Sequence, residues 1–208
     1  EVACFNTAGI TAQMGWDAFA GDKQIGPYTV GASTGTSGNR GLFVISQAER
    51  FRWLGTILAK ALPGFWRGEH KIAVLLPLTT PLYDSANRLK RLQLQFFDIG
   101  GEWFDDLVRF QPTVVIAPPK ILRMLAEADA QIAPCHMFSG AEQLDPLDRV
   151  VIERAFGLTL GQIYMATEGL LAVSCAHGNL HLCEDTMHFE LPAVAGDDVI
   201  IEGGGHDL

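Results

Sequence analysis

Pro112-Thr-Val-Val-Ile-Ala-Pro-Pro-Lys-Ile-Leu-Arg-Met-Leu125 is the stretch that decides the fold. Its first part, Pro112–Ile116, is a short apolar run, which is typical of a strand buried on both faces. Pro118 and Pro119 then stand where proline favours the start of a helix. The apolar residues from Ile121 to Leu125 give that helix a buried stripe. The stretch therefore predicts a buried strand followed at once by a helix.

The same alternation continues on both sides of this stretch. We predict further strands at Lys71–Pro77, Leu92–Ile99, His136–Phe138 and Thr159–Tyr164, and helices at Glu102–Phe110 and Asp145–Phe156. Strands that alternate with helices form right-handed crossovers and a largely parallel sheet. Ligands of such sheets bind beyond the carboxyl ends of the strands.

The two ends of the chain read differently. Residues 1–27 read as a helical entry, and a capping box at Ser46 and Glu49 predicts a helix over residues 47–62. Beyond Gly169 the apolar runs are short and separated by turns, which favours antiparallel strands. We therefore expect an α/β fold: a mostly parallel sheet with flanking helices over residues 1–169, and an antiparallel portion over residues 170–208.

Composition excludes several classes of protein. The 208 residues are 48% hydrophobic, which is too apolar for a disordered chain. A net charge of −9 disfavours a nucleic-acid partner. We expect no membrane span, since no run of eighteen apolar residues exists, and no signal peptide is visible in the residues given. Four cysteines do not make a disulfide framework in a chain of this length. We expect a cytoplasmic protein.

A glycine-rich loop lies between two strand-like runs, Tyr28–Gly31 and Leu42–Ile45. Glycine allows close backbone approach to a ligand, and successive free N–H groups suit a phosphate. Arg40 adds a guanidinium whose fork matches phosphate oxygens. The other interpretation is a flexible linker. The loop predicts phosphate contacts from Ser33, Thr34, Gly35, Thr36, Ser37 and Gly38.

Two more polar stretches follow predicted strands. Tyr164-Met-Ala-Thr-Glu168 offers a ring, a hydroxyl and a carboxylate, and Ser139-Gly-Ala-Glu142 is small enough for a planar ring to approach the backbone. Short motifs carry a high risk of false positives. Taken singly, each could equally be an ordinary polar strand end or a strand-to-helix turn.

Together, the three stretches resemble the adenylate-forming superfamily of acyl- and aryl-acid ligases. Members have a Gly-rich hydroxyl loop, then a Ser-Gly-Gly/Ala-Glu turn, then Tyr-Gly-x-Thr-Glu, in the order found here. His181-Leu-Cys-Glu-Asp185 is similar to a segment of the phenylacetate–CoA ligase branch. The chain departs from the pattern at Asn39-Arg40-Gly41, which lacks the usual proline and lysine, and at Met165 in place of glycine.

The resemblance implies a specific site. The loop and Arg40 would hold the outer phosphates of ATP, Thr167 the α-phosphate, and Glu168 a Mg²⁺ ion. Adenine would lie against Tyr164, with Gly140, Ala141 and Glu142 at its edge. A carboxylic acid would become an acyl adenylate, which CoA or the phosphopantetheine of an acyl carrier protein would then attack.

The resemblance also implies that the family's small C-terminal catalytic domain is absent from the chain, so that this portion can bind nucleotide yet catalyse poorly. The acid would be aromatic or otherwise apolar if Tyr83, Phe97 and Met165 line its pocket. Those residues could equally be core. A nucleotide-binding or carrier-interacting domain without ligase activity is the alternative function. The sequence leaves open whether the chain forms a homodimer.

Four soft metal ligands lie close together in Cys175-Ala-His177 and His181-Leu-Cys183. A hairpin that pairs His177 with His181 would put all four on one face, as a tetrahedral zinc site requires. A two-residue turn at Gly178-Asn179 would shift the register and separate them. Core cysteines and ordinary hairpin histidines remain the other interpretation.

Overall fold

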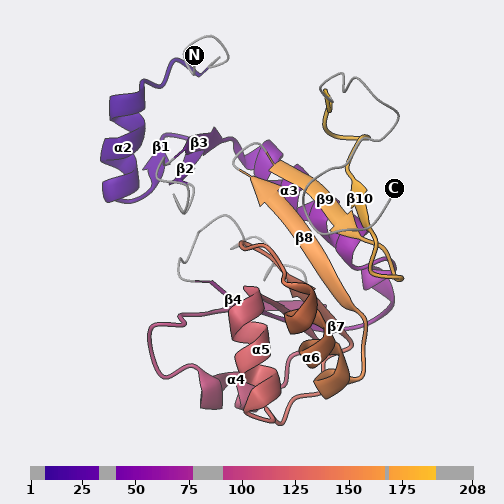
Figure 1. Cartoon of the computed structure of the whole chain (residues 1–208). Helices are drawn as coiled ribbons and strands as arrows, with labels where there is room; N and C mark the ends of the chain where they lie inside the picture. The colour runs from indigo at the N-terminus through magenta and orange to yellow at the C-terminus, as the bar shows by residue number, and fades with distance from the viewer. Residues whose placement is uncertain (1–7, 33–40, 77–90, 167–168, 191–208) are drawn as a thin grey trace.

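The computed structural model describes residues 8–32, 41–76, 91–166 and 169–190. Its main feature is a seven-stranded sheet in the order β10-β9-β8-β7-β6-β4-β5 (Figure 1). The strands are β4 (His70–Leu75), β5 (Leu92–Phe97), β6 (Val114–Ala117), β7 (His136–Ser139), β8 (Leu160–Ala166), β9 (Gly169–Ser174) and β10 (Leu180–Leu182).

The sheet is mostly parallel, as the strand–helix alternation predicts. The pairs β5–β4, β4–β6, β6–β7 and β7–β8 are parallel, whereas β8–β9 and β9–β10 are antiparallel. The carboxyl ends of β6, β7 and β8 therefore meet at one edge. The α/β class with an antiparallel C-terminal portion is confirmed.

Helices cover both faces of the sheet. On one face, α4 (Phe104–Phe110), α5 (Pro119–Glu127) and α6 (Pro146–Phe156) bury Leu107, Leu122 and Ile152 against the sheet (Figure 1). On the other face, α3 (Gln47–Ala61) packs Leu54 and Leu58 against β4, β8 and β9. The central strands β4 and β6 are therefore buried on both faces.

The predicted start of α3 is confirmed in detail. The Ser46 hydroxyl accepts a hydrogen bond from the Glu49 amide at 3.3 Å, and the Glu49 carboxylate accepts one from the Ser46 amide at 2.7 Å. The hydrogen bonds that the Ser46 amide and hydroxyl donate to the Glu49 carboxylate hold the pKa of Glu49 below its ordinary value, because they favour the charged form.

The N-terminal part forms a separate small sheet. The strands β1 (Gln24–Ile25), β2 (Tyr28–Ala32) and β3 (Leu42–Ile45) are antiparallel and lie beside α2 (Ala12–Ala20). The helical entry predicted for residues 1–27 is therefore too long: the chain leaves the helix at Gly21 and turns through Lys23, whose φ is +61°.

Among the short apolar runs beyond Gly169, the sequence predicts a strand at Thr186–Leu191, and this prediction is wrong within the described residues. The amides of Thr186 and Met187 both donate to the Cys183 carbonyl, so the chain turns there. No helix in the described ranges is long and apolar enough to cross a membrane.

Candidate functional site

The candidate site begins where β7 and β8 lie side by side at the carboxyl edge. Ser139 pairs with Gln162, and the turn Gly140–Glu142 follows directly. A Cβ atom added to Gly140 would lie 3.4 Å from the Ile163 carbonyl oxygen, so the two backbones approach closely there. The structure thus brings the Ser139–Glu142 turn next to the strand that carries Tyr164.

Tyr164 and Met165 are both accessible, although they are neighbours on a strand. Tyr164 is 56% exposed and Met165 is 37% exposed. Successive strand residues normally point to opposite faces. Here the β8–β9 register shifts between these two residues, and such irregularities often re-aim side chains beside active sites. An exposed phenol ring is therefore available at the edge for a planar ligand.

The turn itself holds an unusual backbone. Ala141 has a φ of +66°, a conformation that costs a residue with a Cβ atom about 1–2 kcal/mol. Backbone strain of this kind concentrates at ligand sites.

Ser139, just before this turn, is 2% exposed, and its hydroxyl has no hydrogen-bond partner among the residues that the structure describes. Sequence reasoning quoted Ser139 but gave it no role, because burial without a partner leaves no trace in the sequence.

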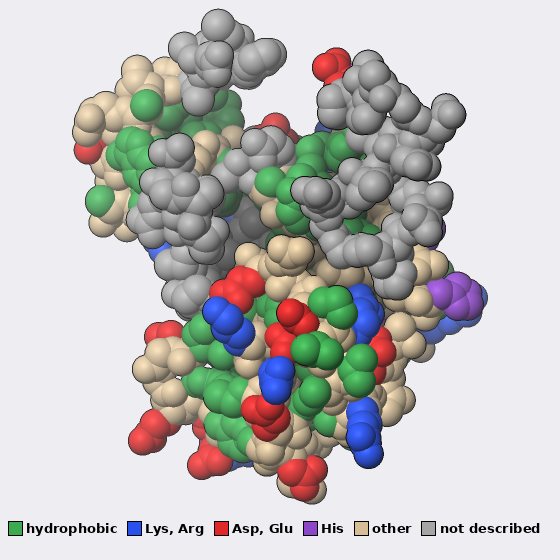
Figure 2. All heavy atoms as spheres, viewed as in Figure 1, with side chains coloured by type: hydrophobic (Ala, Val, Ile, Leu, Met, Phe, Trp, Pro, Cys, Tyr) green, Lys and Arg blue, Asp and Glu red, His purple; other side chains and the backbone are tan. Residues whose placement is uncertain are grey.

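A cation stands close to the same turn. Lys120, in the first turn of α5, places its Nζ 4.0 Å from Oε2 of Glu142. Both side chains are largely exposed, so the pair contributes little stability. The sequence did not lead us to predict a role for Lys120. The signal in the sequence was a lysine at the start of a predicted helix, where the helix dipole disfavours a positive charge. Acidic and basic side chains are interspersed over the α5–α6 face (Figure 2).

Several predicted site residues lie outside the described residues: Ser33, Thr34, Gly35, Thr36, Ser37, Gly38, Arg40, Tyr83, Thr167 and Glu168. The residues that bracket the glycine-rich stretch are described. Ala32 pairs with Leu42 in the antiparallel β2–β3 ladder. The two ends of the stretch are therefore held close together, as its flanking strand-like runs predict.

Phe97 and Met165, the two proposed acid-pocket residues that the structure describes, do not lie close together. Phe97 is 4% exposed and packs its ring 5.7 Å from that of Phe110 in the core, as the core interpretation expects. Strands β4, β6 and β7 lie between β5, which carries Phe97, and β8, which carries Met165. With neighbouring strands about 4.8 Å apart, one small ligand cannot contact both side chains directly.

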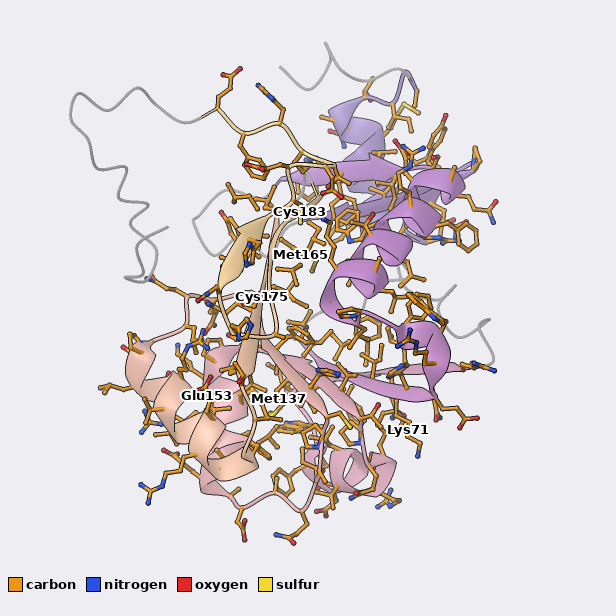
Figure 3. All side chains as sticks on the ribbon, turned by 90° about the vertical axis from the view of Figure 1, so that its right-hand side faces the viewer. Lys71, Met137, Glu153, Met165, Cys175 and Cys183 are labelled. Atoms are coloured by element: carbon orange, nitrogen blue, oxygen red, sulfur yellow. The ribbon has the colours of Figure 1, made fainter. Side chains whose placement is uncertain are left out.

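The hairpin has neither of the two registers considered for zinc. Leu180 pairs with Ser174 and His181 with Val173, and the turn closes with a bond from the Gly178 amide to the Cys175 carbonyl. Cys175 therefore lies level with Asn179 and not with Cys183, and the two thiols are well separated (Figure 3). No three metal-binding side chains cluster within the described ranges, so the zinc hypothesis for Cys175, His177, His181 and Cys183 is not supported there.

An ion pair ties α3 to the segment after β10. Lys60 Nζ lies 2.7 Å from Oδ1 of Asp185. This hydrogen bond lowers the pKa of the Asp185 carboxyl and raises the pKa of Lys60. Burial raises the pKa of the nearby Cys183 thiol. The ion pair joins the last turn of α3 to the chain that follows β10.

No protein-family model matches the chain, and no curated protein matches it in sequence. A similar fold is instead found in solved structures. The α/β domain described above is similar to part of several solved proteins named as CoA ligases.

Three of the solved structures illustrate the similarity. An open 2-hydroxyisobutyryl-CoA ligase with 2-HIB-AMP and CoA matches at a TM-score of 0.53 and 16% identity, over 72% of this chain and 39% of the ligase. A malonyl-CoA ligase with methylmalonyl-CoA and AMP matches at 0.53 and 22%, over 72% and 35%. ATP-bound MatB from Rhodopseudomonas palustris matches at 0.53 and 16%, over 72% and 31%.

The similarity between this chain and the three solved proteins is a similarity of fold. The chain spans 39%, 35% and 31% of the three solved proteins, so their complete activities are not carried over with the fold. The fold does agree with the one implied by the resemblance in the sequence, although the phenylacetate–CoA ligase branch is not among these three structures.

Proposed function

We propose that this chain is the nucleotide-binding part of an adenylate-forming acid–thiol ligase. The observation that carries the proposal is the meeting of the Ser139–Glu142 turn with the exposed Tyr164 at the carboxyl edge of a parallel sheet. That edge is where α/β sheets bind their ligands. Two stretches that the sequence singled out independently are neighbours there.

Adenine would lie against the Tyr164 ring, with the backbone of Gly140 and Ala141 at its edge. A ring that is 56% exposed can stack on a base without rearrangement. Gly140 leaves the backbone open to close approach, because it has no Cβ atom. The Glu142 side chain would lie at the same edge of the adenine base.

The residues that would bind the phosphates of ATP lie outside the described ranges. The stretch Ser33–Gly38 with Arg40 would hold the outer phosphates, Thr167 the α-phosphate, and Glu168 the Mg²⁺ ion. The acid carboxylate would attack the α-phosphorus and release pyrophosphate, and a thiol of CoA or phosphopantetheine would then displace AMP. In such transfers the protein contributes mainly positioning and charge neutralisation.

The acid is proposed to be apolar or aromatic on one side, because Met165 lies partly exposed beside Tyr164. The ring and thioether together would offer an apolar surface at the end of β8. Whether the thiol belongs to free CoA or to a carrier protein is decided by experiment.

Two measurements test the proposal. ATP with Mg²⁺ should raise the midpoint of thermal unfolding, and Tyr164→Ala should reduce that shift, while the exposed control Phe51→Ala on α3 should not. Acid-dependent release of pyrophosphate by the full-length protein then separates a ligase from a nucleotide-binding domain without ligase activity. Absence of stabilisation by any adenine nucleotide would refute both functions.

A further inference from the structure

We propose that the start of α5, with Ser139 and Lys120, binds a carboxylate group, and that this group is a second acidic substituent of the acid substrate. Calling the ligand a substrate rests on the proposed function. The carboxylate site itself rests on three features of the described residues: a buried hydroxyl, a helix start and an ammonium group.

The first feature is the hydroxyl of Ser139. It is buried and unpartnered among the described residues. Because side chains alternate along a strand, Ser139 shares the face of Met137, which packs in the core beneath α5. Ser139 also pairs with Ala117, the last residue of β6 before α5. The hydroxyl therefore lies on the α5 side of the sheet, beside the point where that helix begins.

The second feature is the start of α5 itself. The helix has nine residues, and no side chain caps its N-terminus. The amides of Ile121 and Leu122 both donate to the Pro118 carbonyl, and Pro119 has no N–H group. The Lys120 amide is thus left without an acceptor among the described residues. A free N–H at the positive end of a helix dipole favours an anion.

The third feature is the Lys120 ammonium. Its neighbour Glu142 is 4.0 Å away and exposed, so the contact is easily exchanged. In this proposal a ligand carboxylate takes the place of Glu142 at Lys120 and contacts the Lys120 amide and the Ser139 hydroxyl. One ammonium balances one carboxylate, and Glu142 would repel a doubly charged phosphate. The three donors therefore select a carboxylate.

Calorimetric titration of the full chain without ATP tests the site. The probes are two pairs, acetate with acetamide and benzoate with benzamide, at equal ionic strength. The acid of at least one pair should bind about tenfold tighter than its neutral amide, and Ser139→Ala and Lys120→Gln should each remove about that factor. Arg52→Gln removes an exposed charge on α3, and Ser174→Ala removes a buried hydroxyl on β9; both should retain the preference.

Equal binding of acid and amide in both pairs would overturn the inference, as would an unchanged preference in folded Ser139→Ala and Lys120→Gln proteins. Inorganic phosphate that binds as tightly, with the same dependence on Ser139, would overturn the choice of a carboxylate. Because no ATP is present, a protein that prefers the acids yet never releases pyrophosphate would refute the proposed function alone.

Discussion

Two buried serines should respond in opposite ways to the same substitution. Ser174, 7% exposed on β9, accepts a hydrogen bond from the Gln162 amide at 2.9 Å and donates one to the Gly178 carbonyl at 3.3 Å. Ser139, 2% exposed on β7, has no hydrogen-bond partner among the described residues. Both changes to alanine remove the same atom from a buried strand.

The hydrogen bonds set the expected magnitudes. Ser174→Ala loses two bonds at about 1 kcal/mol each and leaves the Gln162 amide unsatisfied, so the free energy of unfolding should fall by about 2 kcal/mol. Ser139→Ala loses no hydrogen bond to the described residues and removes a buried polar group that has no partner among them. Its free energy of unfolding should stay unchanged or rise by about 1 kcal/mol.

Urea unfolding measures this difference. The midpoint should fall for Ser174→Ala and stay or rise for Ser139→Ala, with the slope m unchanged in both variants. If Ser139→Ala destabilises the protein as much as Ser174→Ala does, the Ser139 hydroxyl has a structural partner. Both the account of the turn and the carboxylate site would then lose their main support.

Three further predictions follow from described contacts. Gly161→Ala should lower the free energy of unfolding by about 1–3 kcal/mol in urea titrations, because the new Cβ would lie 2.6 Å from the buried Phe138 ring. Asp185→Asn should lower the unfolding midpoint above pH 3.8; since the folded pKa of Asp185 is depressed, the difference from the parent should disappear as the pH falls below that value. Tyr164→Ala should weaken ATP and AMP binding by the same factor in calorimetry, about tenfold or more, because the ring would contact only the base.

The sequence predicted the elements whose signals are local. The capping box at Ser46 located the start of α3, and Asp145 caps α6 through the Leu147 amide at 2.7 Å. Apolar runs such as Val114–Ala117 located the central strands. These features depend on contacts between residues that are close in the sequence, so a single sequence is enough to predict them.

Features set by distant contacts were missed. The register of the β9–β10 hairpin depends on a turn closed between Cys175 and Gly178, whereas the glycine–asparagine pair suggested a tighter one. Phe97 could be a pocket or a core residue until strand order placed β5 far from β8. The exposure of Tyr164 beside Met165 depends on a shift in the β8–β9 ladder, which no spacing of residues reveals.

Hydrogen exchange of the full chain with and without ATP–Mg²⁺ tests the nucleotide site most directly. Exchange should slow in residues 139–142 and 160–166 and stay unchanged in β10, an edge strand that β9 separates from β8. Slowing in neither segment, or only in β10, would contradict a nucleotide site at the β7–β8 edge.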